Sequence, residues 1–173
     1  ADLATAIPRA AAAIFSNSGQ ICYAGSRLFV QEKSFERVVA GVAEAGAKMR
    51  LGDGFDPKTE LGPLISRQQR DAVMSYIDEG VDSGAELVGG GKSLDRPGWF
   101  VQPTVFARPR DDLRLVREEV FGPVLAATTF TDLDDLARKA NATRYGLGAG
   151  VFTGNVSTAH RAAKAIRSGN VWI

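Results

Sequence analysis

The sequence predicts an α/β protein with three layers, α/β/α, built around a mostly parallel sheet. Helical and strand-like hydrophobic patterns alternate along the whole chain, as they do in βαβ units. Its 173 residues, 45% hydrophobic and 24% charged, give the apolar content of one well-packed domain. No internal repeat, low-complexity tract or linker divides the chain. We therefore expect a single domain over residues 1–173.

The expected helices carry apolar residues at helical spacing. The first is rich in alanine, and Pro8 is compatible with it only near the first turn. Ser34 and Ser66 are plausible N-caps of the second and third helices, and Gly169 follows the last in the usual C-terminal position. In the third helix, Val81 is expected to face inward. The helices are expected at 4–16, 34–49, 66–82, 132–142 and 156–168.

Short apolar runs bounded by glycine and proline predict the strands. The V-G-G-G-K-S stretch at 88–93 ends like a phosphate-binding loop, but Glu86 stands where such a loop needs glycine, and no helix can follow. We expect a glycine-rich surface turn there. No G-x-G-x-x-G pattern follows a strand, so the chain has no recognisable dinucleotide cradle. Strands are expected at 26–31, 86–88, 99–106, within 121–130, at 148–152 and at 170–173.

The charge balance argues against a polyanionic partner. Lys and Arg number 21 against 20 Asp and Glu, and no long basic or acidic run occurs. We therefore expect neither nucleic acid nor a membrane as a partner. No stretch approaches the roughly 18 apolar residues of a membrane span. The only cysteine, Cys22, cannot form an intrachain disulfide, which favours a reducing compartment and predicts a cytoplasmic protein.

Two interpretations of Cys22 follow from its neighbours: a small buried thiol, or a nucleophile on a loop between a helix and a strand. A thiol with a reference pKa of about 8.5 is only a few per cent thiolate at pH 7, so an active one needs N–H donors, a cation or a base. The turn at Gly19 and Gln20 offers backbone N–H groups, and the residues alone leave both interpretations open. The lone His160 lies within an expected helix and suits a structural role, so no metal site is expected.

Two motifs resemble one known family. The pattern F-x-N-x-G-Q-x-C at 15–22, followed by A-G-S-R at 24–27, resembles the active-site signature of the NAD(P)-dependent aldehyde dehydrogenases. The E-E-V-F-G-P-V block at 118–124 is similar to the E-x-F-G-P motif of the same family, in the same order and at a similar separation. Weaker blocks at 56–64, 98–106, 145–152 and 169–173 extend the resemblance over essentially the whole chain. It implies the α/β/α catalytic domain of that family.

The resemblance implies an oxidoreductase that converts an aldehyde to a carboxylic acid with NAD or NADP. Cys22 would form a thiohemiacetal and then a thioester. Glu119 would accept hydrogen bonds from the nicotinamide ribose hydroxyls, and Phe121 would pack beside the nicotinamide. Gln69 would approach the adenosine ribose of the cofactor.

The neighbours of the nucleophile bear on the substrate. Ile21 and Tyr23 would line the substrate tunnel, and with no adjacent cation they favour an uncharged aromatic or medium-chain aldehyde. The parent enzyme is expected to be a homo-oligomer.

The chain lacks parts that the resemblance implies. The general-base glutamate, the oxyanion-hole asparagine and the dinucleotide-binding domain of the family lie upstream of Ala1. We therefore interpret residues 1–173 as a catalytic domain truncated at both ends, expected to be inactive alone and to bind the cofactor weakly. One alternative is a coenzyme A-acylating aldehyde dehydrogenase, which shares Cys22 but needs no deacylating base. The other is a non-enzymatic structural or interaction module.

Overall fold

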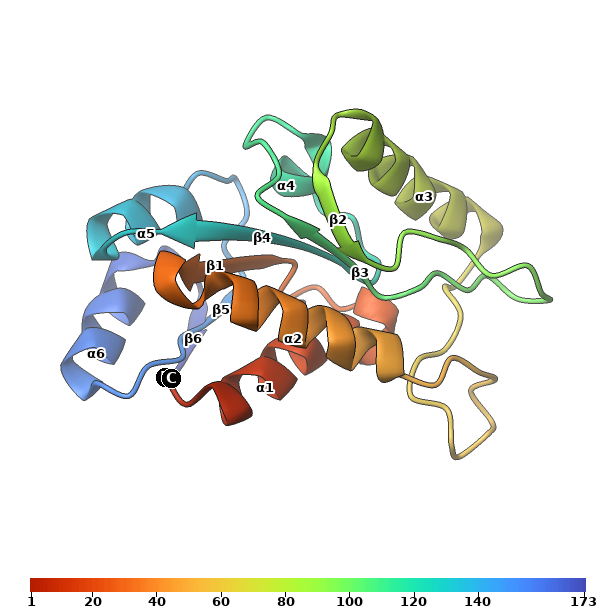
Figure 1. The fold of residues 1–173 in the computed structure, drawn as a ribbon, viewed down its shortest axis with the longest axis horizontal. Helices are drawn as coiled ribbons and strands as arrows, with labels where there is room; N and C mark the ends of the chain where they lie inside the picture. The colour runs from red at the N-terminus through yellow and green to blue at the C-terminus, as the bar shows by residue number, and fades with distance from the viewer.

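A four-stranded sheet forms the middle layer of the computed structural model, which describes residues 1–173 (Figure 1). The strand order is β1-β4-β3-β2. The strands β1 (Arg27–Gln31), β4 (Val124–Phe130) and β3 (Thr104–Ala107) are parallel, and β2 (Glu86–Gly89) pairs with β3 in the antiparallel sense. The expected mostly parallel sheet is confirmed.

Helices cover both faces of this sheet (Figure 1). The helices α1 (Leu3–Phe15) and α2 (Phe35–Lys48) pack on one face, and α3 (Arg67–Asp82) and the short α4 (Arg114–Arg117) pack on the other. The sequence patterns did not predict α4, whose single turn is too short to show a periodicity. The three predicted layers are therefore present.

The side chains of the central strands alternate between two hydrophobic cores, one on each face of the sheet. In β3, Val105 packs among residues of α1 and α2, while Phe106 packs among residues of α3 and α4. In β4, Leu125 and Val124 divide in the same way. Successive side chains of a strand point to opposite faces, so a strand buried on both sides is apolar throughout. The run VLAA at the start of β4 fits this rule.

A second sheet, with two parallel strands, lies beside the four-stranded sheet and its helices. It consists of β5 (Gly148–Gly150) and β6 (Asn170–Trp172), and it is accompanied by α5 (Leu133–Ala140) and α6 (Val156–Ala165) (Figure 1). Arg27 of β1 donates to the carbonyl oxygen of Ala140 at 3.0 Å, which ties the end of α5 to the main sheet. None of the helices combines the length and the hydropathy that crossing a membrane requires.

Several helix ends differ from the sequence prediction. Ser66 caps α3 as expected, accepting from the Gln69 N–H at 3.1 Å, but Ser34 makes no side-chain capping bond to α2. The last helix ends at Ala165, so Gly169 is not its C-terminal glycine; the Gly169 N–H instead donates to Gly146 beside the second sheet.

Two further expectations were wrong in detail. Val81 is exposed, because the buried stripe of α3 continues from Ile77 to Gly80 and Val81 lies one position beyond it. The strand expected at 99–106 is shorter, since Val101 makes only an isolated bridge to Ser93 before β3 begins. The glycine-rich stretch that follows β2 forms a loop, as predicted.

Pro8 lies in the second turn of α1, deeper than the sequence analysis predicted. The helix begins early because Asp2 is its N-cap and accepts a hydrogen bond from the Ala4 N–H at 3.1 Å. Pro8 has no N–H to donate to the Ala4 carbonyl, and its ring crowds the preceding turn.

Replacing Pro8 with alanine is expected to stabilise the protein by about 1–3 kcal/mol, because an interior proline costs about 3 kcal/mol relative to alanine and part of that cost returns through the freer unfolded chain. Urea unfolding of the Pro8→Ala variant measures the change. The exposed neighbour Arg9 supplies the control, since Arg9→Ala should change stability by less than about 0.5 kcal/mol. An unchanged or lower stability of Pro8→Ala would contradict the expectation.

Asp135 joins α5 to the strand before it. Its carboxylate accepts hydrogen bonds from the Thr131 N–H at 3.2 Å and pairs with Lys139 at 3.0 Å. Lys139 also donates to the carbonyl oxygen of Thr129 at 2.7 Å. The hydrogen bond from Lys139 is the main reason why the pKa of Asp135 falls from 3.8 to about 2.

This lowered pKa predicts a pH-dependent contribution to stability. The folded protein holds the Asp135 proton less tightly than the unfolded chain, so the carboxylate stabilises the fold above about pH 4, and the effect is lost as the pH falls through about 2. Asp135→Asn should therefore lower Tm at pH 7, and the difference from the original protein should shrink from pH 4 toward pH 2. The exposed Asp134→Asn serves as the control. A Tm difference that stays constant over this range would contradict the assignment.

Candidate active site

Cys22 lies on the loop between α1 and β1, and its thiol is exposed. The loop begins with a tight turn, Ser16–Gly19, in which Asn17, Ser18 and Gly19 have φ values of 51°, 56° and 70°. Positive φ is uncommon for residues other than glycine, and such a conformation persists only where the surroundings fix it. The shape of this loop therefore depends on its contacts.

Those contacts come from the segment that leads into α3. The buried Ser18 donates its hydroxyl to the carbonyl oxygen of Gly62 at 2.6 Å. The side-chain oxygen of Gln20 accepts from the Ile65 N–H at 3.0 Å, and the amide of Asn17 donates to the Gln20 carbonyl oxygen at 3.0 Å. The Cys22 loop is thus anchored through residues 62–65.

The expected backbone donors do not reach the sulfur. The Gln20 N–H donates to the carbonyl oxygen of Asn17, and the Ala24 N–H donates to that of Ile21. No N–H group of the chain donates to Cys22 Sγ. The turn therefore exposes the thiol, and in this structure it does not supply hydrogen bonds to it.

The second motif, residues 118–124, packs directly against this loop. A Cβ atom added to Gly19 would stand 2.1 Å from the carbonyl oxygen of Gly122. Only a glycine at position 19 allows this approach, because any side chain would overlap the other backbone. Two motifs that are distant in the sequence therefore meet backbone to backbone.

Most of the predicted site residues line one cavity of about 1400 Å³. Cys22, Glu119, Phe121, Ile21 and Tyr23 all line it, together with many residues of β1, β5 and their neighbours. The exposed Glu119 side chain forms no hydrogen bond or ion pair within the chain. Its carboxylate is therefore free to accept hydrogen bonds from a ligand in the cavity.

Gln69 has a different place. It does not line this cavity, and its side-chain amide donates to the carbonyl oxygens of Val120 at 3.1 Å and Phe121 at 2.9 Å. The amide of Gln69 is thus engaged with the second motif. The contact with the adenosine ribose stays a prediction.

Glu118 is held by neighbours, unlike Glu119 beside it. The Tyr76 hydroxyl donates to the Glu118 carboxylate at 2.8 Å, and Arg114 pairs with it at 3.3 Å. The hydrogen bond from Tyr76 and then that from Arg114 lower the pKa of Glu118, while burial and the contact with Glu118 raise the pKa of Tyr76. This difference between Glu118 and Glu119 was not predicted, because it depends on Tyr76, which is distant in the sequence.

Two aromatic side chains, those of Tyr23 and Trp172, pack against each other. The rings of Tyr23 and Trp172 lie with their centroids 5.8 Å apart at an angle of 51°, and both are about half exposed. Gly148 fits beside the pair, since a Cβ there would approach both Tyr23 and Trp172 to 3.0 Å. Trp172 of the second sheet therefore forms an aromatic wall with Tyr23, the residue that follows Cys22.

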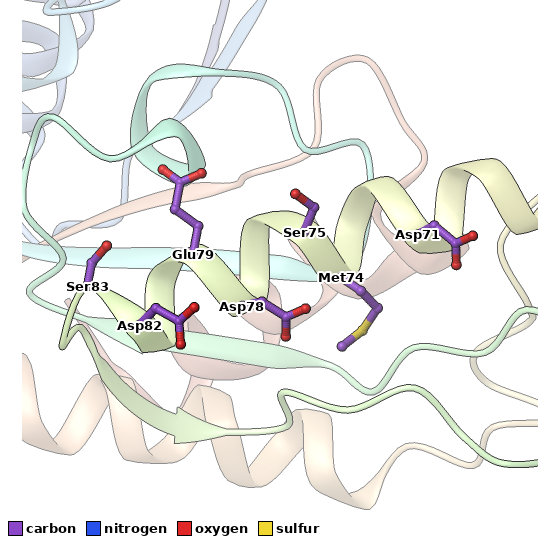
Figure 2. A pocket seen from close by; sticks show the side chains of 7 residues that line it. All are labelled: Asp71, Met74, Ser75, Asp78, Glu79, Asp82 and Ser83. Carbon is purple, nitrogen blue, oxygen red and sulfur yellow. The ribbon is translucent and has the colours of Figure 1, made fainter.

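The outer surface of α3 carries an acidic row around an open depression of about 610 Å³ (Figure 2). Glu79 points toward α4, where it pairs with Arg114 at 3.4 Å. No group of three or more His, Cys, Asp or Glu side chains is arranged to hold a metal ion. His160 is exposed on α6. The acidic residues of the depression are Asp71, Asp78, Glu79 and Asp82.

The match to a known family covers the whole chain. The model of the aldehyde dehydrogenase family matches residues 1–173. This chain belongs to the aldehyde dehydrogenase family. The resemblance to this family that the two motifs indicated is confirmed.

Known aldehyde dehydrogenases resemble the chain in both sequence and structure. The putative aldehyde dehydrogenase DhaS of Bacillus subtilis is 42% identical over all of the chain and 35% of the relative. A betaine aldehyde dehydrogenase of Cereibacter sphaeroides is 44% identical over all of the chain and 36% of the relative. The NAD+ complex of an aldehyde dehydrogenase from Bacillus cereus superposes with a TM-score of 0.97 at 42% identity, covering the whole chain and 35% of that protein. The chain thus spans about a third of the length of these relatives.

Proposed function

We propose that this chain supplies the nucleophile and the nicotinamide-facing loop of an NAD(P)-dependent aldehyde dehydrogenase. Residues 1–173 would form the nucleophile-bearing catalytic domain. The observation that carries the proposal is the arrangement of the two motifs: an exposed Cys22 and an unpaired Glu119 line one cavity, and their loops touch at Gly19 and Gly122.

The donor set suits a nicotinamide cofactor. The free carboxylate of Glu119 can accept hydrogen bonds from two vicinal ribose hydroxyls, and the partly exposed ring of Phe121 offers a flat apolar surface in the same cavity. When bound, the nicotinamide ring takes up the hydride that oxidation of the carbonyl carbon releases. Glu119 and Phe121 would hold the cofactor on the side of the cavity formed by the second motif.

Cys22 would carry the covalent chemistry. Its thiolate attacks the aldehyde carbon, a C–S bond forms, and the carbonyl electron pair moves to oxygen to give a thiohemiacetal. Loss of hydride from that carbon re-forms the C=O bond and leaves a thioester on Cys22. Water then adds to the thioester, the C–S bond breaks, its electron pair and a proton go to sulfur, and the carboxylic acid and the Cys22 thiol are released. Sulfur serves both stages because it is a strong nucleophile and a good leaving group.

Thiol reactivity tests the proposal in the 173-residue chain. Iodoacetamide should alkylate the exposed Cys22 at pH 7, and an aldehyde substrate should slow the reaction by occupying the thiol. Alkylation with no protection by any aldehyde would support the non-enzymatic alternative.

The aromatic wall supports an uncharged aromatic or medium-chain aldehyde as the substrate. Tyr23, which follows Cys22 in the chain, lines the cavity and packs against Trp172, and Ile21 adds apolar surface to the same cavity. Phenylacetaldehyde should therefore protect Cys22 from alkylation at lower concentrations than succinic semialdehyde does. Betaine aldehyde, the compound for which one relative is named, is the cationic comparison. Stronger protection by either charged aldehyde would overturn the proposed substrate class.

The 173-residue chain is expected to show little turnover by itself. No residue of the chain is assigned as the base that activates water, and Glu119 and Phe121 alone offer few contacts to position a dinucleotide. Robust NADH production by the chain with NAD+ and aldehydes would contradict this. Stimulation by coenzyme A in a protein as long as the relatives would favour the acylating alternative over hydrolysis.

The setting of the enzyme is part of the same proposal. A free, exposed thiol at Cys22 is best preserved in a reducing compartment, which supports a cytoplasmic location. The balanced charge supports small-molecule partners over nucleic acid or membranes. We expect the parent enzyme to be a homo-oligomer.

A further inference from the structure

One face of α3 holds the second motif through three successive contacts. Gln69, Val73 and Tyr76 lie at i, i+4 and i+7, so they share a side of the helix. The contacts of Gln69 and Tyr76 with the motif are the hydrogen bonds described above, and Val73 packs beneath Gly122, where an added Cβ would stand 2.5 Å from the valine methyl.

The contact made by Gln69 falls on the strained part of the loop. Phe121 has a φ of 52°, a conformation that a bulky residue adopts only when its surroundings impose it. The side-chain amide of Gln69 donates hydrogen bonds to the carbonyl oxygens of Val120 and Phe121. They therefore fix the peptide units on both sides of the Phe121 α-carbon.

The opposite side of the same loop contacts the loop that carries Cys22. The Gly122 backbone contacts Gly19, three residues before Cys22, so a shift of the 119–122 loop changes its position relative to the thiol. No side-chain hydrogen bond holds Glu119, and the bonds from Gln69 to the Val120 and Phe121 carbonyl oxygens are the only side-chain hydrogen bonds next to it in the 119–122 loop.

We propose that Gln69 is a positioning residue that fixes Glu119 and Phe121 relative to Cys22. The role rests on the proposed function, in which these three residues face the cofactor and the substrate. It acts through hydrogen-bond donation to the backbone, so it requires N–H groups and not merely a side chain of the right size.

Two substitutions of Gln69 distinguish the effect of hydrogen-bond donation from the effect of side-chain size. Gln69→Glu keeps the size but presents a carboxylate with no N–H group to two carbonyl oxygens. Gln69→Met keeps the length without a charge, and it carries the test should the glutamate variant fail to fold. Gln68→Glu is the matched control, because Gln68 is the exposed preceding residue and makes no hydrogen bond. Tyr76→Phe is a second control that removes the contact with Glu118 but leaves both Gln69 bonds.

The only cysteine of the chain provides a direct measure of loop position. A nitroxide attached to Cys22 broadens the NMR signals of nearby amides, so the signals of residues 119–122 report their distance from position 22. Broadening should be strong in the original chain, in Gln68→Glu and in Tyr76→Phe. It should fall by at least about half in both Gln69 variants, and hydrogen exchange of these amides should become at least about tenfold faster, while exchange in α2 stays unchanged.

Unchanged broadening and exchange at 119–122 in a folded Gln69→Glu or Gln69→Met variant would overturn the proposal. An equal loss in Gln68→Glu would also overturn it, because the effect would then come from added charge. The result is independent of catalysis, since Cys22 serves only as a labelling site. A lack of protection of Cys22 by any aldehyde would refute the proposed function and leave the Gln69 result standing.

Discussion

Replacing Gly19 with alanine is expected to destabilise the protein by at least about 2 kcal/mol and to slow the alkylation of Cys22. The new Cβ would stand 2.1 Å from the carbonyl oxygen of Gly122, and the residue would keep a φ of 70°, which costs an L-amino acid about 1–2 kcal/mol before any clash. The loops of the two motifs would have to move apart. Urea unfolding followed by fluorescence measures the first effect, and iodoacetamide kinetics measure the second.

Gly54 provides the matched control for this change. A Cβ added there meets no atom within 4 Å, and its φ lies outside the left-handed region. Gly54→Ala should therefore leave stability unchanged or raise it slightly through the unfolded chain. Equal effects of the two substitutions would show that the approach of Gly19 to Gly122 does not hold the site together.

Cys22→Ser is expected to abolish alkylation and to lower aldehyde oxidation at least about a thousandfold in a protein as long as the relatives, in line with the loss of a catalytic nucleophile. A serine hydroxyl stays protonated at neutral pH and is a poorer leaving group from an acyl intermediate. Because Cys22 is exposed, the substitution should change stability by less than about 0.5 kcal/mol. NADH formation and thermal unfolding measure the two effects.

Ser26→Ala is a suitable control for Cys22→Ser, since it also changes a small residue at the end of the same loop. It should retain activity within about tenfold, because Ser26 contributes no side-chain hydrogen bond to the structure. Aldehyde oxidation by Cys22→Ser within tenfold of the original enzyme would remove Cys22 from the mechanism.

Local periodicity predicted the layers well, because it reflects the same burial that forms them. The helical spacing of Val38 and Val42 and the continuous apolar run at the start of β4 led directly to a sheet covered on both faces. The two motifs also located Cys22 and Glu119 in one cavity. These features depend on residues near one another in the sequence, or on a resemblance that covers the whole chain.

Features that depend on distant partners were not predicted. The engagement of Gln69 with the Phe121 carbonyl and the support of Glu118 by Tyr76 join segments that only the tertiary fold brings together. The short β3 is another case, since Val101 is apolar but stays outside the ladder. Pro8 was misplaced for a local reason, because the cap at Asp2 was not recognised.

At position 18, the sequence combines a strained backbone conformation with a side-chain hydrogen bond that fixes the loop. Glycine would suit its left-handed geometry better than serine, yet glycine has no hydroxyl to secure the corner to Gly62. Ser18 thus has an unfavourable backbone conformation but makes a hydrogen bond that glycine could not make. Removing the strain would remove the hydrogen bond as well. Efforts to make this protein more stable should therefore leave the corner intact and seek gains in α1 or on the outer helices.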